Sequence, residues 1–170
     1  PAAIAADRQL TLPLLTGTGT VVILEDVVAA GQTINAIGIA FPATQSASAA
    51  ANTLDDYEEG AWTPGLTFGG AAVGMTFAFQ LGKYTKIGNQ VKATGYLYLS
   101  IKGSSVGAAV ITGLPFTIAN LTGAWPAVTL DIHGGGITFA DSPKAHGVGN
   151  TATITLEEIT NAGVTSDLTN

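Results

Sequence analysis

The sequence predicts an all-β protein, an antiparallel and jelly-roll-like β-sandwich, from three observations. Short apolar or alternating runs recur about every ten residues, which is the spacing of strands in sandwiches and barrels. The 22 glycines and the abundant threonines suit turns and strands, because glycine permits positive φ and threonine favours the pleated sheet. Helix signals are scarce, since the Ala- and Ser-rich stretch 46–54 fits a linker equally well.

Residues 1–50 form the first predicted unit. Their strand-like runs are too few to build a core that is stable alone. We therefore expect a β-rich stem, or trimerisation arm, that packs on copies of itself around a symmetry axis. The runs are 10–15, 20–24 and 33–39.

Residues 51–170 are predicted to form the sandwich itself. Gly88-Asn89 is a two-residue hairpin signal, which should pair the run 82–87 with the strand that starts at Gln90. The strand-like runs are 66–68, 75–79, 83–87, 90–101, 108–112, 127–132, 137–139 and 151–156.

The strand at 91–101 has the clearest alternation in the chain. Tyr96 and Tyr98 lie on one predicted face, and Leu97, Leu99 and Ile101 lie on the other. The leucine and isoleucine face should enter the core. The tyrosine face should meet water, a neighbouring subunit or a ligand.

Charged side chains are rare in this chain. There are 6 basic and 12 acidic residues, 11% of the whole, whereas an ordinary soluble domain has about 25%. With 46% hydrophobic residues, a lone monomer would expose apolar patches. The composition therefore favours a large subunit interface. The net charge of −6 argues against nucleic acid as a partner, since phosphate binding needs clustered Lys and Arg.

Composition also bears on membranes, redox chemistry and processing. The longest apolar runs are far shorter than the ~20 residues of a spanning helix, so we expect no membrane insertion. No secretory signal is visible, and a chain that starts at Pro1 is expected to be a fragment or a processed product. Because cysteine is absent, the chain uses no disulfide and no thiolate metal site. Assembly in a reducing cytoplasm fits this composition.

An acidic cluster marks the boundary between the two units. Carboxylates can bind Ca²⁺, but the spacing is not that of an EF-hand loop. A glycosidase pair would need two acids across a cleft, which adjacent acids do not provide. The leading interpretation is a solvated junction, and interface salt bridges are the main alternative, so no metal site is predicted. The junction residues are Asp55, Asp56, Tyr57, Glu58, Glu59 and Trp62.

The two histidines indicate no catalytic centre. Asp131 and His133 could belong to a triad, but no Gly-x-Ser-x-Gly elbow supplies a nucleophile. A two-histidine metal site would need a further ligand that the sequence does not identify. We therefore interpret His133 and His146 as loop residues and expect neither enzymatic activity nor a cofactor.

The aromatic residues are the stronger candidates for a binding role. A sugar packs its C–H groups on a flat ring while its hydroxyls bond to nearby polar groups. Trp62 follows the junction, so core or interface packing is favoured for it. The predicted glycan-binding residues are Trp125, Tyr96, Tyr98 and His133.

A series of motifs runs through the chain from about Gly38 onward. The motifs are Phe41–Gln45, Leu54–Gly60, Trp62–Pro64, Leu66–Gly70, Gly82–Asn89, Lys102–Ser105 and Ile111–Thr117. Any one motif alone is weak, but together they are specific, and the series resembles a C-terminal domain of tailed-phage tail fibres and tailspikes. Residues 1–40 match nothing that we recognise. Similar sequences continue beyond Asn170 into a further strand, so we expect an open sheet edge or one filled by another chain.

The resemblance implies a trimeric β-sandwich at a fibre tip, displayed on a virion and made in the host cytoplasm. The implied partners are two further copies of the chain, other tail proteins, and a bacterial surface glycan or outer-membrane receptor. No catalytic motif is carried over. The expected function is therefore host attachment by multivalent, non-catalytic binding. The alternatives are a structural trimerisation module or, third, part of a glycan depolymerase.

Overall fold

The computed structural model describes residues 33–35, 38–41, 44, 49, 52–123, 125–133 and 139–169. The chain divides into two compact units, Pro1–Ser46 and Ala47–Asn170, whereas the sequence analysis set the boundary after residue 50. In the first unit, β1 (Thr33–Asn35) pairs antiparallel with β2 (Gly38–Ala40). We expected one continuous strand over 33–39. The predicted runs 10–15 and 20–24 lie outside the described residues, and the stem role remains a prediction.

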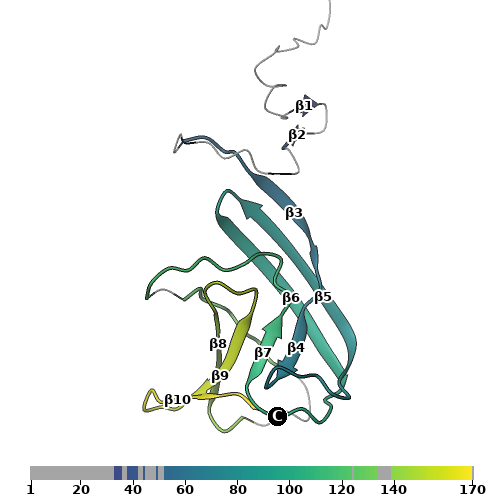
Figure 1. The fold of residues 1–170 in the computed structure, drawn as a ribbon, viewed down its shortest axis with the longest axis vertical. Helices are drawn as coiled ribbons and strands as arrows, with labels where there is room; N and C mark the ends of the chain where they lie inside the picture. Colours follow the sequence, from purple (N-terminus) through teal and green to yellow (C-terminus); the bar gives the residue numbers. More distant parts are fainter. Residues whose placement is uncertain are drawn as a thin grey trace, which may run out of the picture. The chain divides into compact units, whose positions relative to one another are not determined.

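The second unit confirms the predicted fold class. Its regular elements, in the part of the chain that is described, are all strands, and every pairing between them is antiparallel (Figure 1). They form two sheets that pack as a sandwich-like pair. The strands are β3 (Tyr57–Trp62), β4 (Gly65–Phe68), β5 (Thr76–Ile87), β6 (Gln90–Ile101), β7 (Ala109–Thr112), β8 (Ser142–Gly147), β9 (Ile154–Ile159) and β10 (Thr165–Asp167).

The first sheet, which we call the long sheet, has the order β3-β5-β6. Its two longest strands have 12 residues each, so they extend about 40 Å. The turn at Gly88-Asn89 joins them as predicted, with Gly88 at a φ of 56°. A bulge places Phe77 opposite Leu99 but Phe79 opposite Tyr98. Phe77 therefore faces the other sheet, while Phe79 faces outward beside the tyrosines.

The second sheet, which we call the short sheet, has β9 near its centre. Along one edge, β8 pairs with all six residues of β9. The opposite edge is shared, since β7 pairs with Ile154 and Thr155 while β10 pairs with Glu157–Ile159. β4 then pairs with β7 and completes the sheet.

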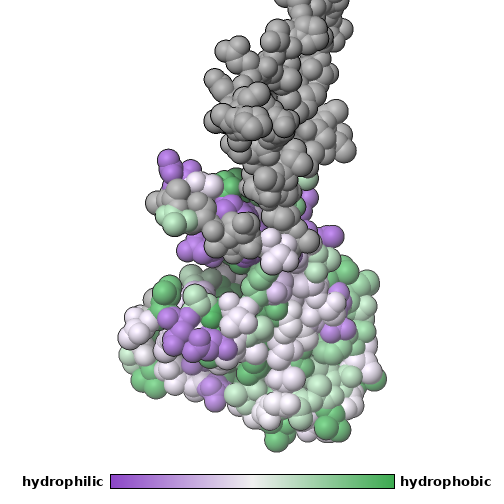
Figure 2. All heavy atoms as spheres, turned by 45° about the horizontal axis from the view of Figure 1, so that its top comes forward, coloured by the Kyte–Doolittle hydropathy of each residue, from purple (hydrophilic) through white to green (hydrophobic). Residues whose placement is uncertain are grey.

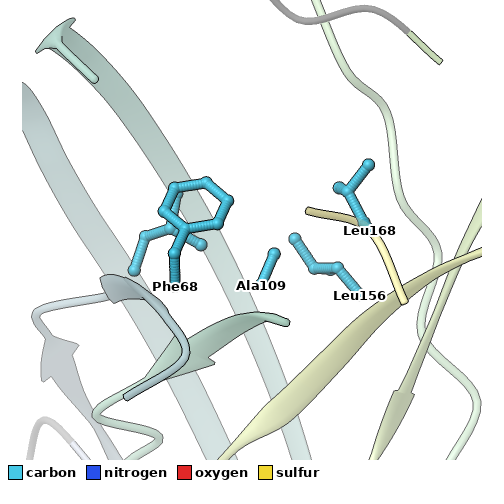
Figure 3. Packing of buried hydrophobic residues seen from close by; sticks show 5 residues of the cluster. Phe68, Ala109, Leu156 and Leu168 are labelled. Atoms are coloured by element: carbon cyan, nitrogen blue, oxygen red, sulfur yellow. The ribbon is translucent and has the colours of Figure 1, made fainter. Parts of the chain in front are cut away.

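The hydrophobic core lies between the inner faces of the two sheets. Side chains from β4, β7, β9 and the segment after β10 form a row in Figure 3. In the described residues no large side chain is fully buried, so this core is thin for a unit of its size. The core residues are Leu66, Phe68, Ala109, Leu156 and Leu168, packed against Met75, Phe77, Leu97 and Leu99 among others.

The alternation predicted for β6 is largely confirmed. Leu97 and Leu99 pack against the core, and Tyr96 and Tyr98 point outward. The expectation for Ile101 was wrong, because its side chain is 57% exposed. The short sheet has strands of only three to six residues, so it does not cover the far ends of the longer hairpin.

Trp62 covers a part of the inner face of the long sheet. Its ring lies over Gly82 and Gly95, where an added Cβ would collide with it. Its indole N–H donates to the Thr94 carbonyl oxygen at 3.0 Å. Two glycines on neighbouring strands therefore make room for one aromatic ring, which packs within its own sheet.

The remaining differences from the sequence analysis concern the number and bounds of the strands. The predicted strands 75–79 and 83–87 are one strand, β5, which continues through the bulge. β3, β8 and β10 were not predicted as strands, because their charged and polar residues hide the alternation. The run 127–132 is not a strand and makes a single bridge, from Ala127 to His146.

Among the described residues there is no helix that could span a membrane.

Candidate ligand-binding surfaces

The outer face of the short sheet is a polar surface. The register places Lys144 opposite Glu157 and His146 opposite Thr155, and side chains of directly opposed residues share one face. The bridge between Ala127 and His146 runs along the free edge of β8. Because side chains alternate along an extended segment, this bridge brings the side chain of the nearby Trp125 to the same face.

Trp125 is the most exposed aromatic residue of the described chain. Its side chain is 71% exposed. One face of its ring stacks on the ring of His146, with a centroid distance of 4.5 Å and an interplanar angle of 17°. The histidine therefore holds the indole in one orientation and leaves most of it open to a ligand.

A charged network lies below this stacked pair. Glu157 Oε2 pairs with Lys144 Nζ at 2.8 Å and lies 3.3 Å from His146 Nδ1. The side chains of Glu157 and His146 are only 17% and 18% exposed, so water screens their interaction less than at an open surface. One carboxylate thus fixes both the lysine and the imidazole on which Trp125 rests.

Tyr96 and Tyr98 lie on the outer face of the long sheet, away from Trp125. Both flank Phe79, with ring centroids 6.3 Å from it in each case. Leu81 lies directly opposite Tyr96. The predicted glycan-binding aromatics therefore belong to two surfaces on two different sheets.

His133 is not a member of the stacked pair described above. It forms an exposed pair with Asp131, with 3.0 Å between Nε2 and Oδ2. The histidine that supports Trp125 is His146, which we had interpreted as a loop residue and which lies on β8. The only sequence signal that His146 lies on a strand is the apolar–polar alternation of residues 142–147, which is too short to recognise.

The acidic junction is only partly solvated, because Tyr57, Glu58 and Glu59 are exposed while Asp56 makes a contact within the chain. Asp56 is buried and pairs with Lys86. Lys86 also lies 5.5 Å from the ring centroid of Phe116. Asp55 is half-buried beside it. In the described part of the chain, no group of three or more His, Asp or Glu residues is arranged to hold a metal ion.

The two glutamates of β3 bind tyrosines on opposite faces of the long sheet. Glu58 accepts a hydrogen bond from the Tyr84 hydroxyl, and this bond, followed by desolvation and the glutamate charge, raises the pKa of Tyr84 above its usual 10.0. Glu59 accepts from the Tyr57 hydroxyl at 3.1 Å, which likewise raises the pKa of Tyr57, with the charge of Glu59 as the second cause. Glu58 therefore ties β3 to β5, whereas the hydrogen bond of Glu59 lies within β3 itself.

Comparison with known proteins adds no relative to these observations: no family model, no curated protein and no solved structure matches the chain.

Proposed function

We propose that this chain is a host-recognition domain of a phage tail fibre or tailspike, which attaches the virion to a bacterial surface glycan without catalysis. The proposal combines the motif series with the polar face that carries Trp125. In the assembled virion, several copies bind at once, and linked weak sites gain a factor of about 10²–10⁴ in apparent affinity. The remaining proposed partners are other tail proteins and further copies of the chain.

The observation that carries this proposal is the exposed Trp125 ring, whose orientation is held by stacking on His146. A sugar ring stacks on an aromatic face while its hydroxyls find polar partners, and here the ring stacks on His146, which shares its sheet face with Lys144 and Thr155. The support from His146 reduces the rotational entropy that a ligand would otherwise have to remove.

The proposal is tested with a panel of purified O-antigen and capsular polysaccharides. We expect the full chain to bind at least one of them and Trp125→Ala to weaken that binding at least tenfold. Trp125→Phe should retain much of it, because the smaller ring still stacks. Val106→Ala is the matched control, since Val106 is 72% exposed and lies elsewhere. Equal binding by Trp125→Ala and the control would overturn the proposal.

A structural trimerisation module is the second candidate function. The outer face of the long sheet favours it, because Phe79 and Leu81 are exposed there beside two tyrosines. The two functions differ in the phenotype of Trp125→Ala. Loss of host adsorption with the assembly intact favours recognition, while loss of the assembly favours the structural module.

A further inference from the structure

The outer face of the long sheet carries a continuous apolar surface. Phe79 lies opposite Tyr98, and Leu81 lies opposite Tyr96. These four residues, which we call the Phe–Tyr patch, are 53%, 49%, 61% and 56% exposed in that order. Hydrophobic and neutral side chains cover much of the visible surface of the unit, and hydrophilic groups gather in few places (Figure 2). A patch of this kind on a sheet face marks an interaction site.

The edge strand beside this patch is also open. In the described part of the chain, β6 pairs only with β5, so its other edge has no strand partner. Natural edge strands are protected by being short, charged or broken by proline. β6 has 12 residues, a single charge at Lys92 and no proline. Patch and edge meet on the same strand, because Tyr96 and Tyr98 belong to β6.

We propose that a second copy of this chain covers the Phe–Tyr patch and the adjoining face of β6. The inference rests on the proposed function in one respect, since multivalent attachment requires several copies in one assembly. It concerns a different surface, however, because Trp125 and its network lie on the outer face of the other sheet. Self-association can therefore hold or fail independently of glycan binding.

The charges on this face include both signs, with Lys83 and Lys92 against Glu59. The patch itself is uncharged, so two copies can meet there without repulsion. Beyond it, the register places Lys83 and Lys92 on the same face as Glu59. A lysine of one copy can therefore meet a glutamate of another at the rim, which is the usual anatomy of an interface with an apolar centre and a polar border.

The available area fits a stable interface between copies. An aromatic or leucine side chain offers roughly 200 Å², so four half-exposed ones leave about 400 Å² per copy. A standard interface takes about 800 Å² from each partner. The same face extends over two 12-residue strands and exposes Ile87 and Tyr57 as well, which supply part of the remainder.

Other occupants fit this face less well. A glycan needs many hydrogen-bonding groups, and the centre of the patch offers only the tyrosine hydroxyls, around Phe79 and Leu81. An anionic membrane surface attracts polybasic faces, whereas this chain has a net charge of −6. A copy of the chain brings the same aromatic rings, and aromatic side chains are enriched where proteins associate.

The first test measures the mass of the full chain by light scattering coupled to size exclusion. We expect two or three times the 17.1 kDa of the chain. Leu81→Lys places a repelling charge in the patch and should reduce the mass to that of the monomer. Val106→Lys, at an exposed site elsewhere, is the control and should retain the assembly. A wild-type monomer, or an assembled and folded Leu81→Lys variant, would overturn the proposal.

A second variant keeps the proposal testable if Leu81→Lys does not fold. The chain has no cysteine, so a single cysteine can be introduced without interference. We expect Tyr98→Cys to form cross-linked species with a short bis-maleimide and Val106→Cys to remain uncross-linked. Equal cross-linking of the two variants contradicts an interface at the patch.

The two proposals give separable results. If the chain assembles but binds no polysaccharide, only the proposed attachment function is contradicted. If the chain is a monomer and binds polysaccharide through Trp125, only the proposed interface is contradicted. A monomer whose polysaccharide binding disappears in Tyr96→Ala would show that the patch holds a glycan, which overturns the interface proposal directly.

Discussion

The two outer faces of this sandwich differ in chemistry although they belong to one small unit. The outer face of the long sheet exposes Phe79 and Leu81 between tyrosines, and the outer face of the short sheet holds a lysine, a histidine and a glutamate below Trp125. The inner faces share one thin core. The difference teaches that one unit can offer an apolar surface to another protein and a polar, aromatic surface to a soluble ligand. In each sheet, the strand register determines which side chains share the outer face.

The largest expected effect separates the inner layer from the apolar outer face. Phe68→Ala removes a ring that is 6% exposed, so it should lower the free energy of unfolding by about 3–5 kcal/mol. Phe79→Ala removes the same ring from the outer face. Its cost should depend on protein concentration, because only association buries that ring. Urea denaturation at two protein concentrations measures the loss of unfolding free energy in both variants. Equal losses that do not change with protein concentration would show that the outer face is not buried by association.

A smaller effect is expected where Trp62 covers the long sheet. Gly82→Ala would push a methyl group into the indole ring, and such overpacking costs about 1–3 kcal/mol. Gly149→Ala is the matched control, because its new methyl group would meet only ordinary contacts at 3.4 Å or more. Chemical denaturation gives the difference, and tryptophan emission reports the displaced ring. A Gly82→Ala variant as stable as the control would show that the ring has room to move.

The polar face can be weakened without touching its tryptophan. Glu157→Gln removes the carboxylate that pairs with Lys144 and lies beside His146, and the loss of a partly exposed ion pair should cost up to about 1 kcal/mol. Asp167→Asn, at the exposed position of β10 directly opposite Glu157, should change stability by less than about 0.5 kcal/mol. Thermal unfolding measures both variants. Polysaccharide binding should fall in Glu157→Gln only, and unchanged binding would show that Trp125 needs no support.

The smallest effect compares the two faces of β3 by titration. The hydrogen bond to Glu58 raises the pKa of Tyr84, so Glu58→Gln should bring it back toward 10.0. A raised pKa means that the stabilisation is complete below pH 10 and is lost as the pH rises through the folded-state value. Glu59→Gln should act in the same way on Tyr57. Ultraviolet absorbance of tyrosinate follows both, and an unaltered titration curve would argue against these hydrogen bonds in solution.

The part of the fold that the sequence predicts is the part built on apolar alternation. β4, β6 and β7 coincide with predicted runs, and Leu97 and Leu99 enter the core as expected. β3 and β8 escaped prediction because their residues are mostly charged or polar. Their conformation is set by long-range pairing with β5 and β9, which local pattern does not encode.

The candidate site was predicted only in part for the same reason. Trp125 could be singled out because a tryptophan in a loop lacks a packing role, and its exposure is consistent with that reasoning. Its support by His146 depends on a bridge between segments about twenty residues apart, and no local signal predicts such a register. Ile101 failed as a core residue because the facing sheet has strands half as long as β6.

Leu168 has a consequence for the time course of folding. Its N–H donates to the Leu156 carbonyl at 3.1 Å, and its own carbonyl accepts from the Ala109 N–H at 2.8 Å, so one buried residue joins two strands. The β5–β6 hairpin closes through a two-residue turn and can form within microseconds. The core beside it needs a partner about a hundred residues after Phe68, and such distant closures are slow. Newly made chains therefore pass through an interval in which the hairpin has formed while its inner leucines are still exposed to water. The length of this interval sets the risk of aggregation during synthesis.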